Sequence, residues 1–395
     1  MVIHHALIFA SDCRFHSGSV RIRNGVFTEV RTDGRAAEPE AGEPALDARG
    51  NYLIPGLVDI HFHGAVGADV SDDTDEAFRK IAAYEAREGI TAICPATLTL
   101  PGERLCSILR RGHAFSKSNA GRADCADLIG FNMEGPFISR ARKGAQNEKY
   151  IRACDVNLAE RFIDASGGLV RYIGVAPEEN PEAEAFIRRI SARTGVSLAH
   201  TDADYETALR AFRAGASHVV HLYNAMPDML HRAPGVIGAA ADTPEADAEL
   251  ICDGIHVHPS AVRNALRMFG PDRIVFISDS LRSTGMADGR YDLGGQTVEK
   301  KGRECRLASD GHLAGSVSSL MECLRYAVLG MGIPLETAVA CATVNPAKSI
   351  REDAQYGSIG PGKKGHAVIL TKGTLRTAAV IKDGRKIRGR EDAAR

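Results

Sequence analysis

The sequence has no long block of basic residues and almost no net charge. It carries 49 basic and 50 acidic residues among 395, for a net charge of −1. Because nonspecific nucleic-acid binding depends on clustered positive charge, we expect no nucleic-acid partner. No apolar run reaches the roughly 18 residues that a spanning helix needs, so we also expect no membrane span.

Disulfide and export signals are missing as well. The nine cysteines are scattered, and none forms a Cys-x-x-Cys pair. This pattern disfavours a disulfide framework or a zinc ribbon and favours reduced thiols in a cytoplasmic protein. The first residues lack the basic and apolar regions of a signal peptide. His4 and His5 could bind a metal weakly, but we expect them to lie in a first strand.

Eight apolar, β-prone runs alternate with helix-like stretches in the middle of the chain. The runs are 57–63, 90–97, 128–134, 170–175, 196–201, 218–223, 249–253 and 273–279. This alternation predicts an α/β fold with a (β/α)8 TIM-like barrel. A doubly wound open sheet is the alternative, and it is disfavoured because no GxGxxG follows an early strand.

Both ends of the chain are rich in short strands. Asn24-Gly25 and Asp383-Gly384 are hairpin signals between apolar, β-prone segments. We therefore predict that residues 1–54 and 358–395 together form a small β-sandwich domain. Residues 55–357 would form the barrel.

Ionisable residues stand at or near the carboxyl ends of six of the eight runs. They are His61, His63, Glu134, His200, His221, Asp253 and Asp279. Active sites of (β/α)8 enzymes gather at these ends. Taken singly, a strand histidine is more often structural, Glu134 could be a loop acid, and Asp279 could cap the next segment. Several such residues at matching ends are harder to explain by packing.

Imidazoles and carboxylates together favour a metal centre. His61 and His63 alternate along a strand, so their rings point to the same side. The whole set suits zinc or ferrous iron better than magnesium or calcium. A metal would lower the pKa of bound water to roughly 7 and polarise a carbonyl. Asp279 could take that proton and return it to a leaving nitrogen. No GxSxG nucleophile motif is present, which agrees with direct hydrolysis.

A series of short motifs extends from about residue 50 to residue 365. They are PGLVDIHFHG (55–64), NMEGPF (132–137), APE (176–178), AHT (199–201), HLYNAM (221–226), DGIH (253–256), SDS (278–280) with TG (284–285), LAGS (313–316) and NPA (345–347). In this order they resemble the motifs of N-acetylglucosamine-6-phosphate deacetylases of the amidohydrolase superfamily. The combination is specific, whereas each motif alone is weak.

This resemblance implies a site for one or two divalent ions per subunit. Zn²⁺ is the expected ion, with Fe²⁺, Mn²⁺ or Co²⁺ as alternatives. Asp279 would be the general base and then the general acid. The implied ligands of the main metal are Glu134, His200 and His221. Those of a second ion are His61 and His63.

The resemblance also implies a phosphosugar pocket and a homodimer. Arg232 and His256 would bind the phosphate near the subunit interface, where the planar fork of an arginine can pair two phosphate oxygens. Without the resemblance, Arg232 would be interpreted as a surface arginine and residues 313–315 as a turn. The other implied substrate contacts are Ala145, Gln146, Asn224, Ala225, Leu313, Ala314 and Gly315.

The chain departs from the family pattern at Gln146. The family usually has histidine after Lys-Gly-Ala, near the acetyl carbonyl. Glutamine can still donate an N–H, but it carries no charge. Losing one such donor can cost on the order of a hundredfold in rate. Either a second metal at His61 and His63 shares this work, or the substrate differs from the usual one.

The expected activity is hydrolysis of N-acetylglucosamine 6-phosphate to glucosamine 6-phosphate and acetate. A related phosphosugar such as N-acetylgalactosamine 6-phosphate is an alternative substrate. A cyclic-amide hydrolase is disfavoured because no lysine stands at a strand end. A phosphosugar-binding protein without catalysis is a further alternative, although a pure binder needs no proton carrier such as Asp279.

Overall fold

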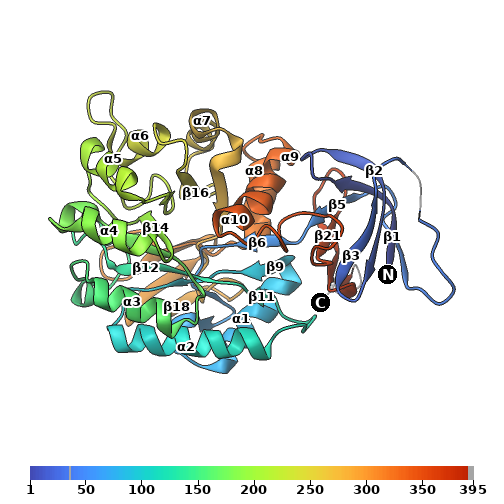
Figure 1. Ribbon diagram of the computed structural model, residues 1–395, viewed down its shortest axis with the longest axis horizontal. Coiled ribbons are helices and arrows are strands. Elements are labelled where there is room, and N and C mark those ends of the chain that lie inside the picture. Colours follow the sequence, from blue (N-terminus) through green and yellow to red (C-terminus); the bar gives the residue numbers. More distant parts are fainter. Residues whose placement is uncertain (35–36, 390–395) are drawn as a thin grey trace.

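A computed structural model describes residues 1–34 and 37–389 (Figure 1). Each of the eight predicted runs contains a strand. They are β6 (Leu57–Asp59), β9 (Ile90–Ile93) with β10 (Ala96–Thr97), β11 (Asp127–Leu128) with β12 (Phe131–Phe137), β13 (Val170–Val175), β14 (Gly195–Leu198), β15 (His218–Val219), β16 (Asp247–Ile251) and β17 (Ile274–Ile277). They pair in parallel in the orders β6-β9-β11 and β10-β12-β13-β14-β15-β16-β17.

The parallel strands curl until the last one meets the first. The backbone N–H of Asp279 donates to the carbonyl oxygen of His61 at 2.9 Å, and that of His63 donates to Ser280 at 2.8 Å. The curled parallel sheet is consistent with a TIM-like barrel and confirms the predicted α/β class. It also brings the carboxyl ends of first and last strands together, where the site residues lie.

Helices cover the outside of the curled sheet (Figure 1). They are α1 (Asp75–Glu88), α2 (Gly102–Ser118), α3 (Val156–Ala165), α4 (Ala183–Ser191), α5 (Tyr205–Ala214), α6 (Gly235–Ala241), α7 (Pro259–Phe269), α8 (Leu320–Leu329), α9 (Leu335–Ala342) and α10 (Val344–Ser349). Local signals set several ends: Thr74 caps the start of α1 and Gly89, at φ 93°, ends it. Among the described residues, no helix is both long and apolar enough to cross a membrane.

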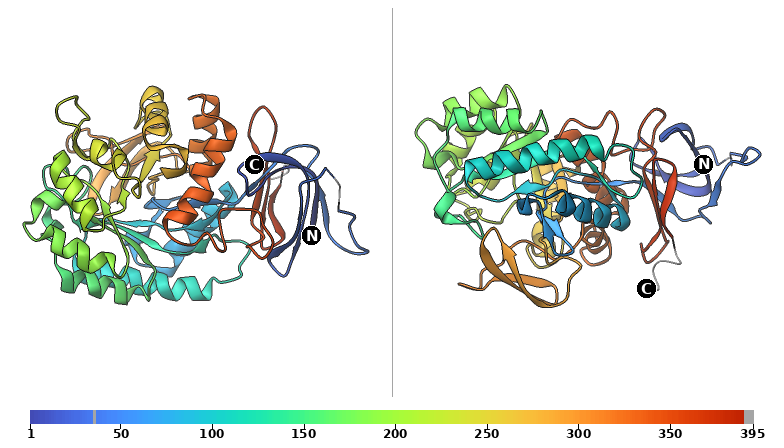
Figure 2. Two further views of the ribbon diagram at one scale, coloured as in Figure 1. Left: turned by 45° about the horizontal axis from the view of Figure 1, so that its top comes forward. Right: turned by 90° about the horizontal axis from the view of Figure 1, so that it is seen from below.

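Strands from both ends of the chain form one connected sheet beside the barrel (Figures 1 and 2). Its strands are β1 (Val2–Phe9), β2 (Phe15–Arg23), β3 (Val26–Arg31), β4 (Ala45–Asp47), β5 (Tyr52–Pro55), β21 (Ala367–Leu370), β22 (Thr377–Lys382) and β23 (Arg385–Gly389). Strand β21 pairs with β5 and so joins the two ends of the chain. Both predicted hairpins are present, with Arg23 opposite Val26 and Lys382 opposite Arg385. Residues 35–36 and 390–395 of the predicted small domain lie outside the described residues.

Some elements were not predicted from the sequence. After the last barrel strand, β18 (Gly289–Leu293), β19 (Gln296–Lys301) and β20 (Glu304–Leu307) form an antiparallel sheet, drawn in orange in the right panel of Figure 2. Others are β4 and β5 of the terminal sheet, the strand pair β7 (Gly64–Ala65) and β8 (Ala68–Asp69), and the short 3-10 helices η1 (Val70–Asp72), η2 (Glu148–Tyr150), η3 (Pro177–Glu179) and η4 (Pro271–Arg273).

Candidate metal centre and substrate pocket

Six ionisable side chains converge at the carboxyl ends of five barrel strands. None of the six residues is more than 7% exposed. We call this set the mouth cluster. Its members are His61 and His63 after β6, Glu134 in β12, His200 after β14, His221 after β15 and Asp279 after β17.

Three of these residues have a left-handed backbone. The φ angles of His200, His221 and Asp279 are 46°, 30° and 49°. This conformation costs a non-glycine residue roughly 1–2 kcal/mol, and such strain is common at functional sites. In each case the strand ends two residues earlier, so the chain turns where the side chain enters the cluster.

Glu134, His200 and His221 form a compact triad. Oε1 of Glu134 lies 2.7 Å from Nε2 of His200 and 3.0 Å from Nε2 of His221, and the two nitrogens are 3.2 Å apart. The Nδ1 atoms face the backbone oxygens of Arg142 at 2.8 Å and Asn224 at 3.1 Å. Because a carbonyl only accepts, each neutral ring carries its hydrogen on Nδ1 and directs the Nε2 lone pair inward.

His61 and His63 complete a second group around the same carboxylate. Nε2 of His63 lies 3.3 Å from Oε2 of Glu134 and 3.3 Å from Oδ1 of Asp279. Nε2 of His61 lies 3.6 Å from Oε1 of Glu134 and 3.7 Å from Oδ1 of Asp279. These distances bring two imidazoles and two carboxylates around a common point.

Three buried atoms of the mouth cluster have no hydrogen-bond partner. They are Nε2 of His61, Nδ1 of His63 and Oδ1 of Asp279. A buried polar atom without a partner is costly and calls for an explanation. A divalent cation would satisfy Nε2 of His61 and Oδ1 of Asp279 at once, since they lie 3.7 Å apart. The set of neutral imidazoles and carboxylates suits zinc or a similar ion. The residues present therefore fit a metal centre.

The electrostatics of the cluster also favour a bound cation. Burial alone would raise the pKa of Glu134, but the charges and hydrogen bonds of His200, His221 and His61 hold it well below its usual range. Burial alone would lower the pKa of His63, but Asp279 and Glu134 raise it to about 10. The carboxylates thus attract positive charge strongly. A metal ion must displace protons from the imidazoles, since only the neutral ring ligates.

Glu249 contacts His61 on the side away from the cavity, and no role for it was predicted from the sequence. It is fully buried in β16, and its Oε2 lies 2.8 Å from Nδ1 of His61. Its Oε1 lies 2.9 Å from Nε2 of His218 and accepts from Asn132 at 3.0 Å. A carboxylate that holds the outer nitrogen of a ligating histidine is a common feature of metal sites. The available signal was an acidic residue inside an apolar strand run.

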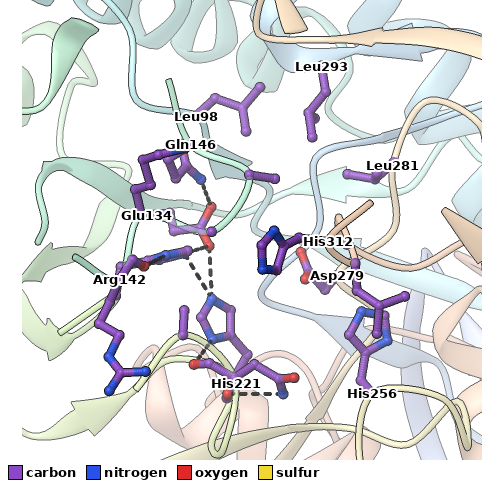
Figure 3. Close-up of a pocket in the computed structure, with 18 of the residues that line it drawn as sticks. Leu98, Glu134, Arg142, Gln146, His221, His256, Asp279, Leu281, Leu293 and His312 are labelled. Carbon is purple, nitrogen blue, oxygen red and sulfur yellow. Dashed lines mark hydrogen bonds and ion pairs between the residues drawn. The ribbon is translucent and has the colours of Figure 1, made fainter. Parts of the chain in front are cut away.

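Gln146 does not direct a free amide into the cavity. Its Oε1 accepts from the backbone N–H of Thr99 at 2.7 Å, which fixes the amide orientation because that N–H can only donate. Its Nε2 therefore donates to Oε2 of Glu134 at 2.5 Å (Figure 3). The expectation of an N–H near the acetyl carbonyl is not what this geometry shows. Gln146 holds the carboxylate of Glu134 instead.

A cavity of about 790 Å³ opens above the mouth cluster. Leu98, Leu281 and Leu293 lie along one side of it, and His221 and His256 lie on the other (Figure 3). The predicted contacts that line it are Ala145, Gln146, Asn224, Ala225, His256, Leu313 and Gly315.

Two predicted substrate contacts lie outside this cavity. Ala314 is 1% exposed and packs in an apolar cluster with Leu281 and Leu293. Arg232 is exposed, and its guanidinium lies 2.8 Å from the ring of the adjacent His231. The fold of one subunit therefore does not bring Arg232 to the mouth cluster.

Basic side chains that were not predicted from the sequence also line the cavity. They are the cations Arg140, Arg142, Lys143 and Arg306, together with the imidazole of His312. Gly144 allows the 140–143 loop to lie close to His200: at its φ of 54°, an added Cβ would lie 3.2 Å from the ring of His200. The cavity thus combines an apolar side, a metal-binding floor and a positively charged rim.

The comparisons with known proteins agree with this geometry. The chain matches the amidohydrolase family over residues 52–388. It is 36% identical to the N-acetylglucosamine-6-phosphate deacetylase of Bacillus subtilis, over 90% of this chain and 89% of that protein. It is 34% identical to the N-acetylgalactosamine-6-phosphate deacetylase of Escherichia coli O157:H7, over 81% of this chain and 84% of that protein.

A solved structure resembles nearly the whole chain. It is that of a variant of N-acetyl-D-glucosamine-6-phosphate deacetylase from Mycobacterium smegmatis in complex with N-acetyl-D-glucosamine-6-phosphate. Its TM-score is 0.88 at 29% identity, and 98% of each chain is covered. The chain therefore belongs to the amidohydrolase family and, within it, to the family of the N-acetylglucosamine-6-phosphate deacetylases.

Proposed function

We propose that this protein hydrolyses the N-acetyl group of N-acetylglucosamine 6-phosphate and releases glucosamine 6-phosphate and acetate. The observation that carries the proposal is the mouth cluster, in which Glu134 faces His200 and His221 at 2.7 and 3.0 Å while Asp279 keeps a buried oxygen without a hydrogen bond. Relatives that carry this activity by name support the substrate.

The ligands and the proton carrier have separate roles in this proposal. Glu134, His200 and His221 would hold one divalent ion, and His61 and His63 would hold a second. Zn²⁺ is our first choice, with Fe²⁺, Mn²⁺ or Co²⁺ as alternatives. The bound metal would polarise the acetyl carbonyl and make a water more acidic.

Asp279 is suited to carry the proton. Burial alone would raise its pKa, but the contact with His63 at 3.3 Å and the positive charge of His61 lower it, so the carboxylate is ionised at neutral pH. It would accept a proton from the attacking water and deliver it to the amide nitrogen as the C–N bond breaks.

The phosphate end of the substrate would be bound by His256 and Arg232. His256 lines the cavity, and its Nδ1 lies 2.8 Å from Oδ2 of Asp253. Arg232 lies outside the cavity beside Met229 and Leu230, which are 48% and 58% exposed. We propose that this loop pairs with a second copy in a homodimer, so that Arg232 and His256 lie near the interface. Ala145, Gln146, Asn224, Ala225, Leu313, Ala314 and Gly315 would surround the sugar and the acetyl group.

An acetate-release assay tests the proposal. Zinc-loaded protein should release one acetate for each N-acetylglucosamine 6-phosphate consumed, and Asp279→Asn should release almost none. No acetate from this compound, from the galactosamine epimer or from related phosphosugars would refute the proposal.

N-acetylgalactosamine 6-phosphate is a second candidate substrate. The 34% identity to a relative named for that epimer supports it. A higher kcat/KM for the galactosamine epimer would select this candidate. Tight binding of either sugar without turnover under any metal would instead favour a non-catalytic binding protein.

We also propose a division into two domains. Residues 1–54 and 358–395 would form a small β-sandwich domain, and residues 55–357 the barrel. A separate buried apolar cluster supports the division, since residues of both terminal segments, such as Ile8, Phe27, Leu53 and Ile369, pack together in it.

A further inference from the structure

A second group of metal-ligating side chains lies on the terminal sheet, outside the mouth cluster. His4 and His5 are in β1, and Asp47 ends β4. The Nδ1 atoms of His4 and His5 are 3.0 Å apart. Oδ1 of Asp47 lies 3.1 Å from Nδ1 of His5 and 4.0 Å from Nδ1 of His4. Three potential ligand atoms therefore face one another.

The fold brings these residues together in an uncommon way. Strands β1 and β4 pair in parallel with His4 opposite Asp47. Consecutive residues of a regular strand point to opposite faces, so His4 and His5 would normally diverge. Here the register of β1 with β2 shifts between Ile3 and Ala6, and His5 has a φ of 52°. This irregularity turns both rings toward Asp47.

Hydrogen bonds alone leave this group poorly satisfied. Nδ1 of His5 can hold one hydrogen or one lone pair, yet it faces both His4 and Asp47. If it donates to Asp47, it has no lone pair left for a hydrogen from His4. A cation at the centre would instead take a lone pair from all three atoms.

We propose that His4, His5 and Asp47 bind a divalent cation of intermediate softness, zinc above all, at a surface site. The ligands of a tetrahedral zinc ion, at 2.0–2.1 Å from the metal, are about 3.3 Å apart. The three separations of 3.0, 3.1 and 4.0 Å bracket this value. The backbone N–H of Arg49 donates to Oδ1 of Asp47 at 2.8 Å and holds the carboxylate in place. The side chains of His5 and Asp47 are 60% and 46% exposed, which leaves room for water as a fourth ligand.

The consequence of this site is structural. An ion there links β1 to β4 and adds to the parallel pairing of these two strands. Because a metal that binds only the folded state stabilises it, zinc would raise the melting temperature through this site. The site lies on a different sheet from the mouth cluster, so its loss should leave catalysis unchanged.

Zinc stoichiometry tests the site. We suggest equilibrium dialysis of the full-length protein, without a histidine tag, at fixed free zinc, followed by elemental analysis. His5→Asn is the main variant, since asparagine tolerates a positive φ. We expect it to bind one zinc ion fewer per chain than the wild type and to show a smaller zinc-induced rise in melting temperature. Equal zinc content in the two proteins would overturn the proposal.

Two further variants make the result decisive. His16→Asn is the matched control, because His16 is an exposed histidine of the same sheet that faces a single carboxylate, Asp12, at 2.8 Å. It should bind as much zinc as the wild type. Asp47→Asn keeps an oxygen for the N–H of Arg49 and answers the question if His5→Asn does not fold. It should lower the affinity for one zinc ion by roughly tenfold or more. An unchanged zinc affinity would contradict the site.

Discussion

Two buried clusters of charged and polar groups differ in which atoms they leave unpaired. The mouth cluster leaves Nε2 of His61, Nδ1 of His63 and Oδ1 of Asp279 without hydrogen-bond partners, whereas the second cluster leaves Nδ1 of His366. The other, which we call the junction cluster, lies where the terminal sheet meets the barrel and includes Asp127, Tyr356, His366, Lys382 and Asp383. The fully buried Nζ of Lys382 donates to Arg122 O, Asp127 Oδ1 and Asp383 Oδ2 at 2.8, 2.8 and 3.2 Å.

This difference distinguishes a cluster that can bind a ligand from one that stabilises the fold. All three hydrogens of the Lys382 ammonium are used, and the second oxygens of its two carboxylates accept from Tyr356 at 2.9 Å and face His366 at 3.1 Å. Such a network holds two parts of the fold together. The mouth cluster has spare lone pairs and a cavity above it. Spare ligand atoms next to a cavity are what a metal centre needs.

The largest effect should follow Asp279→Asn. Asparagine cannot accept the proton from water, so kcat for acetate release should fall on the order of a thousandfold. The melting temperature should change little, because Oδ1 of Asp279 makes no hydrogen bond and only faces His63 and His61 at 3.3 and 3.7 Å. Stopped acetate assays and thermal unfolding measure the two quantities. A drop in stability without loss of activity would place Asp279 with the supporting residues.

The junction cluster should respond in the opposite way. Lys382→Met leaves the partly buried carboxylates of Asp127 and Asp383 without their cation, which should lower the free energy of unfolding by about 3–5 kcal/mol. Activity per folded molecule should stay unchanged. Lys80→Met is the control, since Lys80 forms only an exposed pair with Glu76 and should change stability by about 0.5 kcal/mol or less. Denaturant titration checks both variants, and equal stabilities would show that the buried network contributes nothing.

Gln146→Ala probes the connection between ligand and support. It removes the donor to Glu134 and leaves the N–H of Thr99 unpaired. Loss of a group that orients a ligand typically costs about 10–100-fold in metal affinity or activity, and we expect both zinc affinity and kcat to fall within that range. Gln146→His, which restores the residue usual in the family, is the matched comparison. A change in KM alone would show that Gln146 contacts substrate and does not position Glu134.

The smallest effect should come from Arg232→Ala. If Arg232 binds the substrate phosphate across a dimer, KM should rise by about tenfold or more while kcat stays similar, since a charged hydrogen bond contributes about 1.5–3 kcal/mol. Arg213→Ala is the control, because Arg213 is an exposed arginine in the last turn of α5. Sedimentation of the wild type tests the dimer independently. Unchanged KM would assign Arg232 to the surface.

The sequence predicted the positions of the barrel strands because each apolar run is bounded by turns and polar residues. It also predicted the convergence of His61, Glu134 and Asp279, since carboxyl ends of parallel strands meet at one end of a barrel. The left-handed backbone of His200 and His221 could not be foreseen, because it depends on contacts made after folding.

Other features could not be predicted from the sequence, again for physical reasons. Glu249 lies 188 residues from its partner His61, and no local pattern connects them. The orientation of Gln146 follows from a backbone N–H that faces it only in the folded state. The β18–β20 sheet follows the last barrel strand as an insertion, and the alternation of strands and helices does not predict it.

An anomalous-difference map from crystals of the zinc-loaded protein tests the central claim, that the mouth cluster is a metal centre. We predict a peak between Glu134, His200 and His221, and a second peak beside His61 and His63 that disappears in the His61→Asn, His63→Asn double variant. A map without any peak among these residues, from protein that is folded and hydrolyses the substrate, would contradict the account.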